Sequence, residues 1–407
     1  MSRPTPQFIN SQLQAAIVTE ALNTLFAPFP LALGVTLRNR VVMAPMTTWS
    51  GNADGTVADA ELAYYRRRVN GVGLVVTGCS HAQPNGIGFT DEFAAYHDRF
   101  VPSLSRLARA AKSGGAPALL QLFHAGNKAV PALVPDSEIV SASAVGTAAS
   151  SFSPAITPRA LTNEEIGDVI RAFGDATRRA IEAGFDGVEL HGAHGFLIQN
   201  FLSPRFNHRK DKWGGSLQNR MRFPLAVVRE VQQAIAVCAT RPFVLGYRIS
   251  VEEPGEGGLR IDDALALVDQ LVDAGIGYLH VSLSNALEDR PLHGAGDTTT
   301  AEHVVERVAG RVPVIAAGQI RTPQQAENAL GLGLSLVSVG QGLVMNPEWV
   351  ELAQHGRDEE IETSLRPSAV PDLDIPDKLW KVSEATNGWF TLHDESDVGS
   401  VGLCPTA

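Results

Sequence analysis

The chain has 407 residues and a formal net charge of −11, from 44 acidic and 33 basic side chains. This acidic balance argues against a nucleic acid as the partner, because duplex binders normally present a basic face. The three cysteines lie far apart and exclude a cluster held by four cysteines, and no apolar run reaches the roughly 18 residues of a membrane span, so we expect a cytoplasmic protein.

Short runs rich in β-branched residues alternate with segments of helical periodicity along most of the chain. Eight of these runs are predicted as strands, at residues 41–45, 73–78, 118–124, 187–191, 243–250, 278–282, 312–317 and 336–340. One helix is expected to begin after Thr162, as its N-cap, and to end at Gly184. Alternating strands and helices imply parallel strands with right-handed crossovers, and eight units fit a closed (β/α)8 barrel, the TIM barrel of the α/β class. An open doubly wound sheet would need a glycine fingerprint after its first strand, and the sequence has none there.

The other segments are expected to decorate this single domain. We place the barrel at residues 25–356, an N-terminal extension at 1–24 and an acidic C-terminal tail at 357–407. A helical segment is expected near the N-terminus, followed by a hairpin that closes the bottom of the barrel. In the tail, Trp380 and Trp389 are expected to serve as anchors.

Active sites of such barrels form at the C-terminal ends of the strands, so residues at these ends are candidates. His191 and His194 follow the fourth strand among glycines, so both rings can point into one cavity, where each offers an N–H donor. Gly318 and Gly340 end the seventh and eighth strands, where backbone N–H groups can approach a phosphate closely. Arg248 lies at the end of the fifth strand and, when buried, needs an anionic partner.

Each of these residues also has a simpler interpretation. The spacing of His191 and His194 suits a metal site, but the first strand has no histidine and the eighth has no acid, so we expect no metal. Glycines after strands are often ordinary turn residues. The run Arg66, Arg67 and Arg68 is expected to form a solvated helix face.

Several segments, in order along the chain, resemble the Old Yellow Enzyme family of FMN-dependent NAD(P)H oxidoreductases. They are NRVVMAPMTTW (39–49), QLFHAGNK (121–128), GFDGVELHGAHGFLIQNFLSPRFNHRKDKWGGSLQNRMRF (184–223), GYRIS (246–250) and VPVIAAGQI (312–320). A further segment, AELAYYRRRVNGVGLVVTG (60–78), is similar to the subgroup of NADH-dependent flavin oxidoreductases. The resemblance implies the barrel fold, FMN as the cofactor, and NADH or NADPH as the reductant.

The resemblance also implies which residues bind the cofactor. These are Ala44, Pro45, Met46, Thr47, Gly78, Gln121, Arg248, Gly318, Gly340 and Gln341. Thr47 would donate toward the C4 carbonyl of the flavin. Arg248 would face its N1–C2 side, where a fixed guanidinium stabilises the negative charge that reduction leaves.

On the substrate side, the resemblance implies two catalytic residues and a pocket wall. His191 and His194 would hydrogen-bond the carbonyl oxygen of the substrate and stabilise the charge that develops there. Trp49 and Phe196 would line the substrate pocket.

Two positions depart from the family pattern. Phe196 stands where the family has a tyrosine that donates a proton to the substrate, and a phenyl ring cannot donate one. Gln341 stands where the family has an arginine that contacts the FMN phosphate, although Arg321 lies close in sequence to the same rim. The proton donor and the strength of FMN binding are therefore open.

From these residues we expect ping-pong hydride transfer from NAD(P)H, through FMN, to an activated alkene such as an α,β-unsaturated carbonyl compound. Phe196 leaves open an NAD(P)H:flavin or quinone oxidoreductase with little alkene reduction. Gln341 leaves open a non-catalytic barrel that has lost FMN. The expected partner is a small molecule, with no nucleic acid or membrane partner and with homo-oligomerisation allowed.

Overall fold

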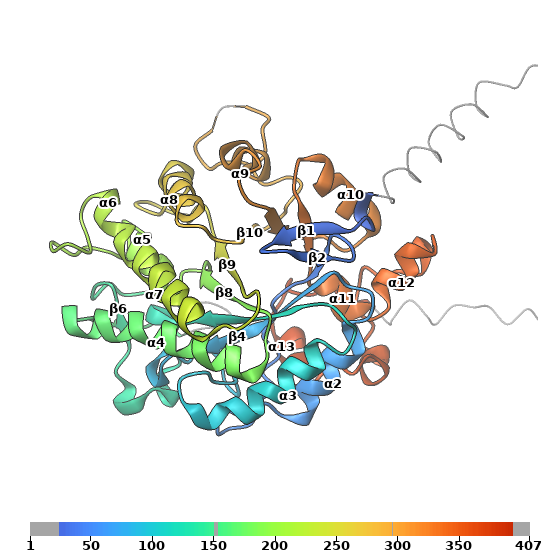
Figure 1. Ribbon diagram of the computed structural model, residues 1–407, viewed down its shortest axis with the longest axis horizontal. Helices are drawn as coiled ribbons and strands as arrows, with labels where there is room; N and C mark the ends of the chain where they lie inside the picture. The colour runs from blue at the N-terminus through green and yellow to red at the C-terminus, as the bar shows by residue number, and fades with distance from the viewer. Residues whose placement is uncertain (1–23, 150–153, 295, 394–407) are drawn as a thin grey trace, which may run out of the picture.

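The computed structural model describes residues 24–149, 154–294 and 296–393 (Figure 1). The helical segment predicted near the N-terminus lies outside the described residues. Within them, eight parallel strands close into a barrel. In spatial order these strands are β3 (Val41–Met43), β4 (Leu74–His81), β5 (Ala118–Phe123), β8 (Gly187–Gly192), β9 (Val244–Ile249), β10 (Tyr278–Ser282), β11 (Val314–Ala317) and β12 (Leu336–Val339). The barrel and the eight predicted strands are confirmed.

Helices connect the strands and surround the barrel (Figure 1). The described helices are α2 (Asp59–Arg68), α3 (Val101–Ala111), α4 (Asn163–Ala183), α5 (Leu197–Leu202), α6 (Leu217–Arg220), α7 (Arg222–Cys238), α8 (Ile261–Asp273), α9 (Thr300–Val308), α10 (Pro323–Gly331), α11 (Gln341–Met345), α12 (Trp349–Gln354) and α13 (Asp377–Ala385). None of them has the length and apolar character needed to cross a lipid bilayer.

Both predicted ends of α4 are confirmed, with Thr162 as its N-cap and Gly184 as its C-cap. The Thr162 hydroxyl accepts a hydrogen bond from the Glu165 backbone N–H at 3.2 Å, and the Glu165 carboxylate accepts one from the Thr162 N–H at 2.7 Å. This reciprocal capping box satisfies donors that the first turn leaves free. At the other end, Gly184 has a φ of 91°, which glycine adopts without steric cost.

The predicted hairpin is formed by β1 (Phe29–Ala32) and β2 (Val35–Leu37), and it closes the bottom of the barrel. Its Leu31 and Leu37 side chains are buried in one cluster with inward-facing strand residues such as Val42 and Leu74. Side chains therefore fill the barrel at this end, and the active site is expected at the opposite end. A second short pair, β6 (Val140–Ser141) with β7 (Arg159–Ala160), lies in the long insertion after β5.

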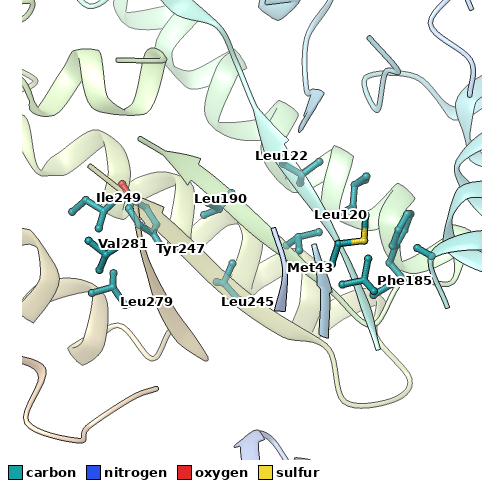
Figure 2. Close-up of a cluster of buried hydrophobic side chains, with 14 of the residues drawn as sticks. Met43, Leu120, Leu122, Phe185, Leu190, Leu245, Tyr247, Ile249, Leu279 and Val281 are labelled. Carbon is teal, nitrogen blue, oxygen red and sulfur yellow. The ribbon is translucent and has the colours of Figure 1, made fainter. Parts of the chain in front are cut away.

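Alternate strand residues point outward and pack between the barrel and the helices. Figure 2 labels such buried strand residues, namely Met43, Leu120, Leu122, Leu190, Leu245, Tyr247, Ile249, Leu279 and Val281, together with Phe185, which lies just before β8. Burial on both faces explains why the strands read as continuous apolar runs in the sequence.

The described part of the C-terminal tail packs back on the barrel, and Arg68 of α2 fastens it. The guanidinium donates to the backbone carbonyl oxygens of Leu373 and Asp374, and it stacks over the Tyr64 ring at 4.2 Å. These contacts give a buried cation the acceptors that it needs.

The expectation that Arg66, Arg67 and Arg68 form a solvated face is therefore wrong for one of the three. Arg66 is exposed and Arg67 pairs with Glu348, but Arg68 is 0% exposed. Its partners in the tail, Leu373 and Asp374, lie about 300 positions away in sequence, so local charge patterning could not reveal its burial.

A second buried charge on α2 makes stability depend on pH. Glu61 is fully buried, accepts a hydrogen bond from the Thr48 hydroxyl, and has no partner for Oε1 among the described residues. Burial raises the pKa of Glu61 to about 7, although the Thr48 hydrogen bond opposes the shift. The folded-state pKa of Glu61 lies above the unfolded one. The stability that Glu61 contributes to the free energy of unfolding is therefore fully present below pH 4.5 and is lost as the pH rises through about 7.

We therefore expect Glu61→Gln to stabilise the protein at pH 8 by up to about 3 kcal/mol, because the variant has no charge to bury. At pH 5 the wild-type carboxyl is already protonated in the folded state, so the difference should shrink strongly. Thermal unfolding of both proteins at the two pH values checks this. A difference in melting temperature that is the same at both values would contradict the assigned cause.

Candidate active site

A cavity of about 450 Å³ opens at the C-terminal ends of the barrel strands. Its size suits a small-molecule or cofactor site. All but one of the residues predicted for the site line it, namely Ala44, Pro45, Met46, Thr47, Trp49, Gln121, His191, His194, Phe196, Arg248, Gly318, Gly340 and Gln341. Eight strands thus bring together residues that are spread over most of the chain.

Gly78 is the predicted residue that does not line the cavity. Strand β4 continues past it to His81 through an irregularity in register, so Gly78 is inside the strand. A side chain on Gly78 would lie 2.6 Å from the Met46 carbonyl oxygen, so glycine permits the close approach of these two segments. Its neighbour Cys79 faces the cavity instead, with its sulfur 3.4 Å from the Thr47 hydroxyl oxygen. The sequence prediction missed Cys79 because it ended the strand at residue 78, three residues before the end of β4 at His81.

Below the cavity, the barrel interior holds a buried carboxylate with three hydrogen-bond donors. Glu189 accepts from Gln121 Nε2 at 2.7 Å, from the Tyr278 hydroxyl at 2.9 Å and from His280 Nδ1 at 2.9 Å. Gly246 makes room for this arrangement, because a Cβ there would lie 2.1 Å from the Tyr278 ring. Since its Nε2 is held by Glu189, Gln121 keeps its Oε1 as an acceptor for a ligand.

Glu189 is also the counter-charge of Arg248. Burial by itself would raise the pKa of Glu189, but its hydrogen bonds and the charges of His280 and Arg248 outweigh burial and lower it. Arg248 is 6% exposed and donates through Nη2 to the Ser282 hydroxyl at 3.1 Å. Its Nε has no partner among the described residues. A buried guanidinium with free donors at a cavity wall calls for an acceptor-rich ligand.

The hydrogen bonds of the two histidines define which ring nitrogen carries the proton. The backbone N–H of Ala193 donates to His191 Nδ1 at 3.3 Å, so neutral His191 carries its proton on Nε2. His194 Nε2 lies 2.7 Å from the Ser282 oxygen. The Ser282 hydroxyl accepts from Arg248 and can donate its own hydrogen to His194 Nε2, an arrangement in which neutral His194 carries its proton on Nδ1. Each ring therefore offers one N–H donor.

Both histidines are neutral donors. Burial lowers the pKa of His191 well below its ordinary value, and the charge of Arg248 acts in the same direction. His194 is exposed at the cavity, and desolvation by the side chains around it, together with the charge of Arg248, lowers its pKa in the same direction. The ring centroids are 4.9 Å apart, so both donors can approach one oxygen atom. Among the described residues, no third His, Cys, Asp or Glu joins this pair in a metal-binding cluster.

Strained backbone positions cluster at this cavity. Trp49, His194 and Gln319 all line it, and they have φ values of 50°, 60° and 55°. Such left-handed conformations cost about 1–3 kcal/mol each in a non-glycine residue and persist where the surroundings hold them. The His194 backbone is held on both sides, since its N–H donates to the Ser250 hydroxyl at 3.1 Å and its carbonyl accepts from Lys128 Nζ at 2.6 Å.

Aromatic rings form part of the cavity wall, beside the histidines. Phe196 lies 4.8 Å from His191 between ring centroids, and Phe89 lies 5.4 Å from Trp49. Trp389 of the tail packs on Trp49 at 5.7 Å and lines the cavity. The tail thus completes the site, a role that the expectation of a simple anchor missed.

The ends of β11 and β12 form the remaining side of the cavity. Gly318 has a φ of 154°, and a Cβ there would lie 2.7 Å from the Leu283 carbonyl oxygen, so this position requires glycine. Arg321 donates to Gln341 Oε1 at 2.8 Å, and Gln341 Nε2 donates to the Trp389 carbonyl oxygen. Gln341 therefore ties the tail to the barrel, and the positive charge beside the glycines comes from Arg321.

These groups fit FMN. Arg248 has free donors and Gln121 a free acceptor, which suits the polar pyrimidine edge of a flavin. Gly318 and Gly340 with Arg321 suit a phosphate at neighbouring strand ends.

Comparisons with known proteins agree with this fit. The NADH:flavin oxidoreductase / NADH oxidase family matches residues 24–360. Over 371 residues the chain is 40% identical to the probable NADH-dependent flavin oxidoreductase YqiG of Bacillus subtilis (strain 168), covering 91% of this chain and 98% of that protein. It is 37% identical to an NADH:fumarate oxidoreductase of Klebsiella pneumoniae (strain 342), covering 88% of this chain but only 39% of that longer protein. Morphinone reductase in complex with tetrahydroNAD has a TM-score of 0.68 at 27% identity, over 82% of this chain and 90% of that one.

The family match includes all eight barrel strands and every predicted site residue that lines the cavity. The resemblance to the Old Yellow Enzyme family is thereby confirmed, and so are FMN as the cofactor and a nicotinamide as the reductant. The chain belongs to the NADH:flavin oxidoreductase / NADH oxidase family and is an NAD(P)H-dependent flavin oxidoreductase.

Proposed function

We propose that this enzyme transfers a hydride from NADH or NADPH to an α,β-unsaturated carbonyl compound by a ping-pong mechanism. The observation that carries the proposal is the pair of neutral N–H donors on His191 and His194, whose rings lie 4.9 Å apart in an aromatic-walled cavity. Two such donors at one oxygen stabilise the charge that develops when the β-carbon of an enone receives a hydride.

Two sets of residues in the cavity have separate roles, one at the cofactor and one at the acceptor. When bound, FMN accepts a hydride from the nicotinamide and supplies it to the acceptor. Arg248 and Gln121 would hold the pyrimidine edge of the cofactor, and the fixed charge of Arg248 favours its reduced form. His191 and His194 orient the acceptor by its carbonyl oxygen. Phe196, Phe89 and Trp49 exclude water from the reacting atoms, which strengthens these electrostatic contacts.

The Klebsiella relative supports an acceptor with a conjugated carbon–carbon double bond. Its name specifies fumarate, which is an α,β-unsaturated carboxylate. The chain spans only 39% of that protein, so the name supports the acceptor class and not the whole activity.

A second candidate function is an NAD(P)H:flavin or quinone oxidoreductase with little alkene reduction. The observation in its favour is Phe196, which packs against both histidines and has no proton to give. A quinone or a free flavin takes up its protons on oxygen or nitrogen, where exchange with water is fast.

Turnover of the purified holoenzyme distinguishes the two functions. NADH oxidation is followed anaerobically with 2-cyclohexenone, with menadione, and with neither. Our proposal requires that cyclohexenone supports turnover and yields cyclohexanone. Turnover with menadione but none with cyclohexenone would favour the second candidate.

Removing the two histidine donors should abolish the anchoring of the acceptor. We expect the double variant His191→Ala/His194→Ala to lower the rate of enone reduction by at least about 10²–10³, the usual effect of losing one such donor. Its affinity for p-hydroxybenzaldehyde, read from the flavin absorbance, should fall as well. The exposed His355 provides the control variant His355→Ala, which should match the wild type. Unchanged phenol binding and enone reduction in the double variant would contradict the assignment.

Arg248 should make bound FMN easier to reduce. We expect Arg248→Met to shift the midpoint potential of the flavin to more negative values and to lower the FMN content, because a buried positive charge beside the cofactor is lost. A spectroelectrochemical titration of the holoprotein measures the shift, with Arg66→Met, at an exposed position, as control. A midpoint potential equal to that of the wild type would show that Arg248 does not face the flavin ring.

A further inference from the structure

The proposed reduction of an enone needs a proton as well as a hydride, and this inference rests on that proposed function. Addition of hydride to the β-carbon leaves an enolate, whose α-carbon must then be protonated. His191 and His194 are engaged at the oxygen, and Arg248 does not give up its proton in a protein. Phe196, the ring next to the histidines, has no protic group. Another donor beside the histidines, either a side chain or water, must therefore supply the proton.

Lys128 lies at this place. It ends a short helical turn, Gly126–Lys128, directly after β5, and its half-buried side chain lines the cavity. Its Nζ donates to the His194 carbonyl oxygen at 2.6 Å and lies 5.9 Å from the centroid of the Phe196 ring. The ammonium group thus lies between the His194 backbone carbonyl and the Phe196 ring.

The surroundings of Lys128 also suit an acid. The His194 carbonyl takes one of the three ammonium hydrogens, which leaves two for a ligand or water. Burial lowers the pKa of Lys128 from its usual value, while the charge of Glu253 opposes the shift. A lowered pKa brings the group closer to the operating pH, where a general acid works best. The nearby histidines are neutral and Arg248 is a cation, so they do not hold the proton on Lys128.

We propose that Lys128 is the proton donor to the α-carbon of the acceptor. In this step the electron pair of the enolate forms the new C–H bond at the α-carbon, and one N–H bond of the ammonium breaks. The carbonyl group re-forms, and the neutral amine takes a proton from water before the next turnover. The hydride at the β-carbon and this proton together account for both hydrogens added to the double bond.

Two other roles for Lys128 must be separated from proton donation. The ammonium could act only through its charge, or it could only hold the strained His194 backbone. Arginine keeps the charge and can donate to the same carbonyl, but it does not release a proton near neutral pH. Methionine keeps the length and removes both functions. Lys381, which is exposed on α13, provides a matched control as Lys381→Met.

The experiment follows the two half-reactions of each holoprotein by anaerobic stopped-flow absorbance. Each protein is reduced with one equivalent of NADH and then mixed with 2-cyclohexenone or, separately, with oxygen. The dissociation constant of p-hydroxybenzaldehyde is measured in parallel as a readout of cavity structure. We expect Lys128→Arg and Lys128→Met both to slow reoxidation by cyclohexenone about 10²-fold or more, the range for a lost general acid. Reduction by NADH, reoxidation by oxygen and phenol affinity should change by less than about threefold.

Each other outcome overturns the proposal. Reoxidation of Lys128→Arg by cyclohexenone at the wild-type rate would assign Lys128 a purely electrostatic role. Equal losses in all steps and in phenol affinity would assign it a purely structural one, and a wild-type rate in Lys128→Met would leave it no role. Failure of the proposed function itself looks different, because wild-type enzyme reduced by NADH would then not be reoxidised by cyclohexenone.

Discussion

The site depends on one buried negative charge in the middle of the barrel. Glu189 is 0% exposed, and a carboxylate at that depth is costly unless it is paired and hydrogen-bonded. It meets this requirement with donors from Gln121, Tyr278 and His280 and with the charge of Arg248. The same contacts orient the amide of Gln121 and keep a cation at the cavity wall. The need to satisfy the buried charge of Glu189 therefore shapes both the barrel interior and the cofactor side of the cavity.

From Arg248 a chain of hydrogen bonds continues toward the acceptor. Its guanidinium donates to Ser282, whose hydroxyl contacts His194, and the His194 carbonyl accepts from Lys128. The group that would face the flavin and the groups that would face the acceptor are thus held in one network. The strained backbone at His194, with a φ of 60°, is held by Lys128 of this network on one side and by Ser250 on the other.

The sequence was sufficient for the barrel, because eight runs of buried strand residues carry a signal that is local to each run. It also named half of the residues that line the cavity. The strand-end rule indicated five of them, His191, His194, Arg248, Gly318 and Gly340, and the family resemblance supplied the others. What it missed depends on contacts that are distant in sequence or on a shift in register. Cys79 faces the cavity through the irregularity in β4, Arg68 is buried by the tail, and Trp389 arrives from the far end of the chain. No sequence pattern marked Lys128 as a site residue, because its role depends on the contact with the His194 carbonyl, which only the structure shows.

The central claim is that neutral His191 and His194 anchor the oxygen of the acceptor above a cofactor held at Arg248. A crystal structure of the FMN-loaded enzyme with p-hydroxybenzaldehyde tests this most directly. The account predicts the phenolic oxygen at about 2.7–3.2 Å from both His191 Nε2 and His194 Nδ1, with the guanidinium of Arg248 at the pyrimidine edge of the flavin. A ligand oxygen that contacts neither histidine, or a flavin bound away from Arg248, would contradict it.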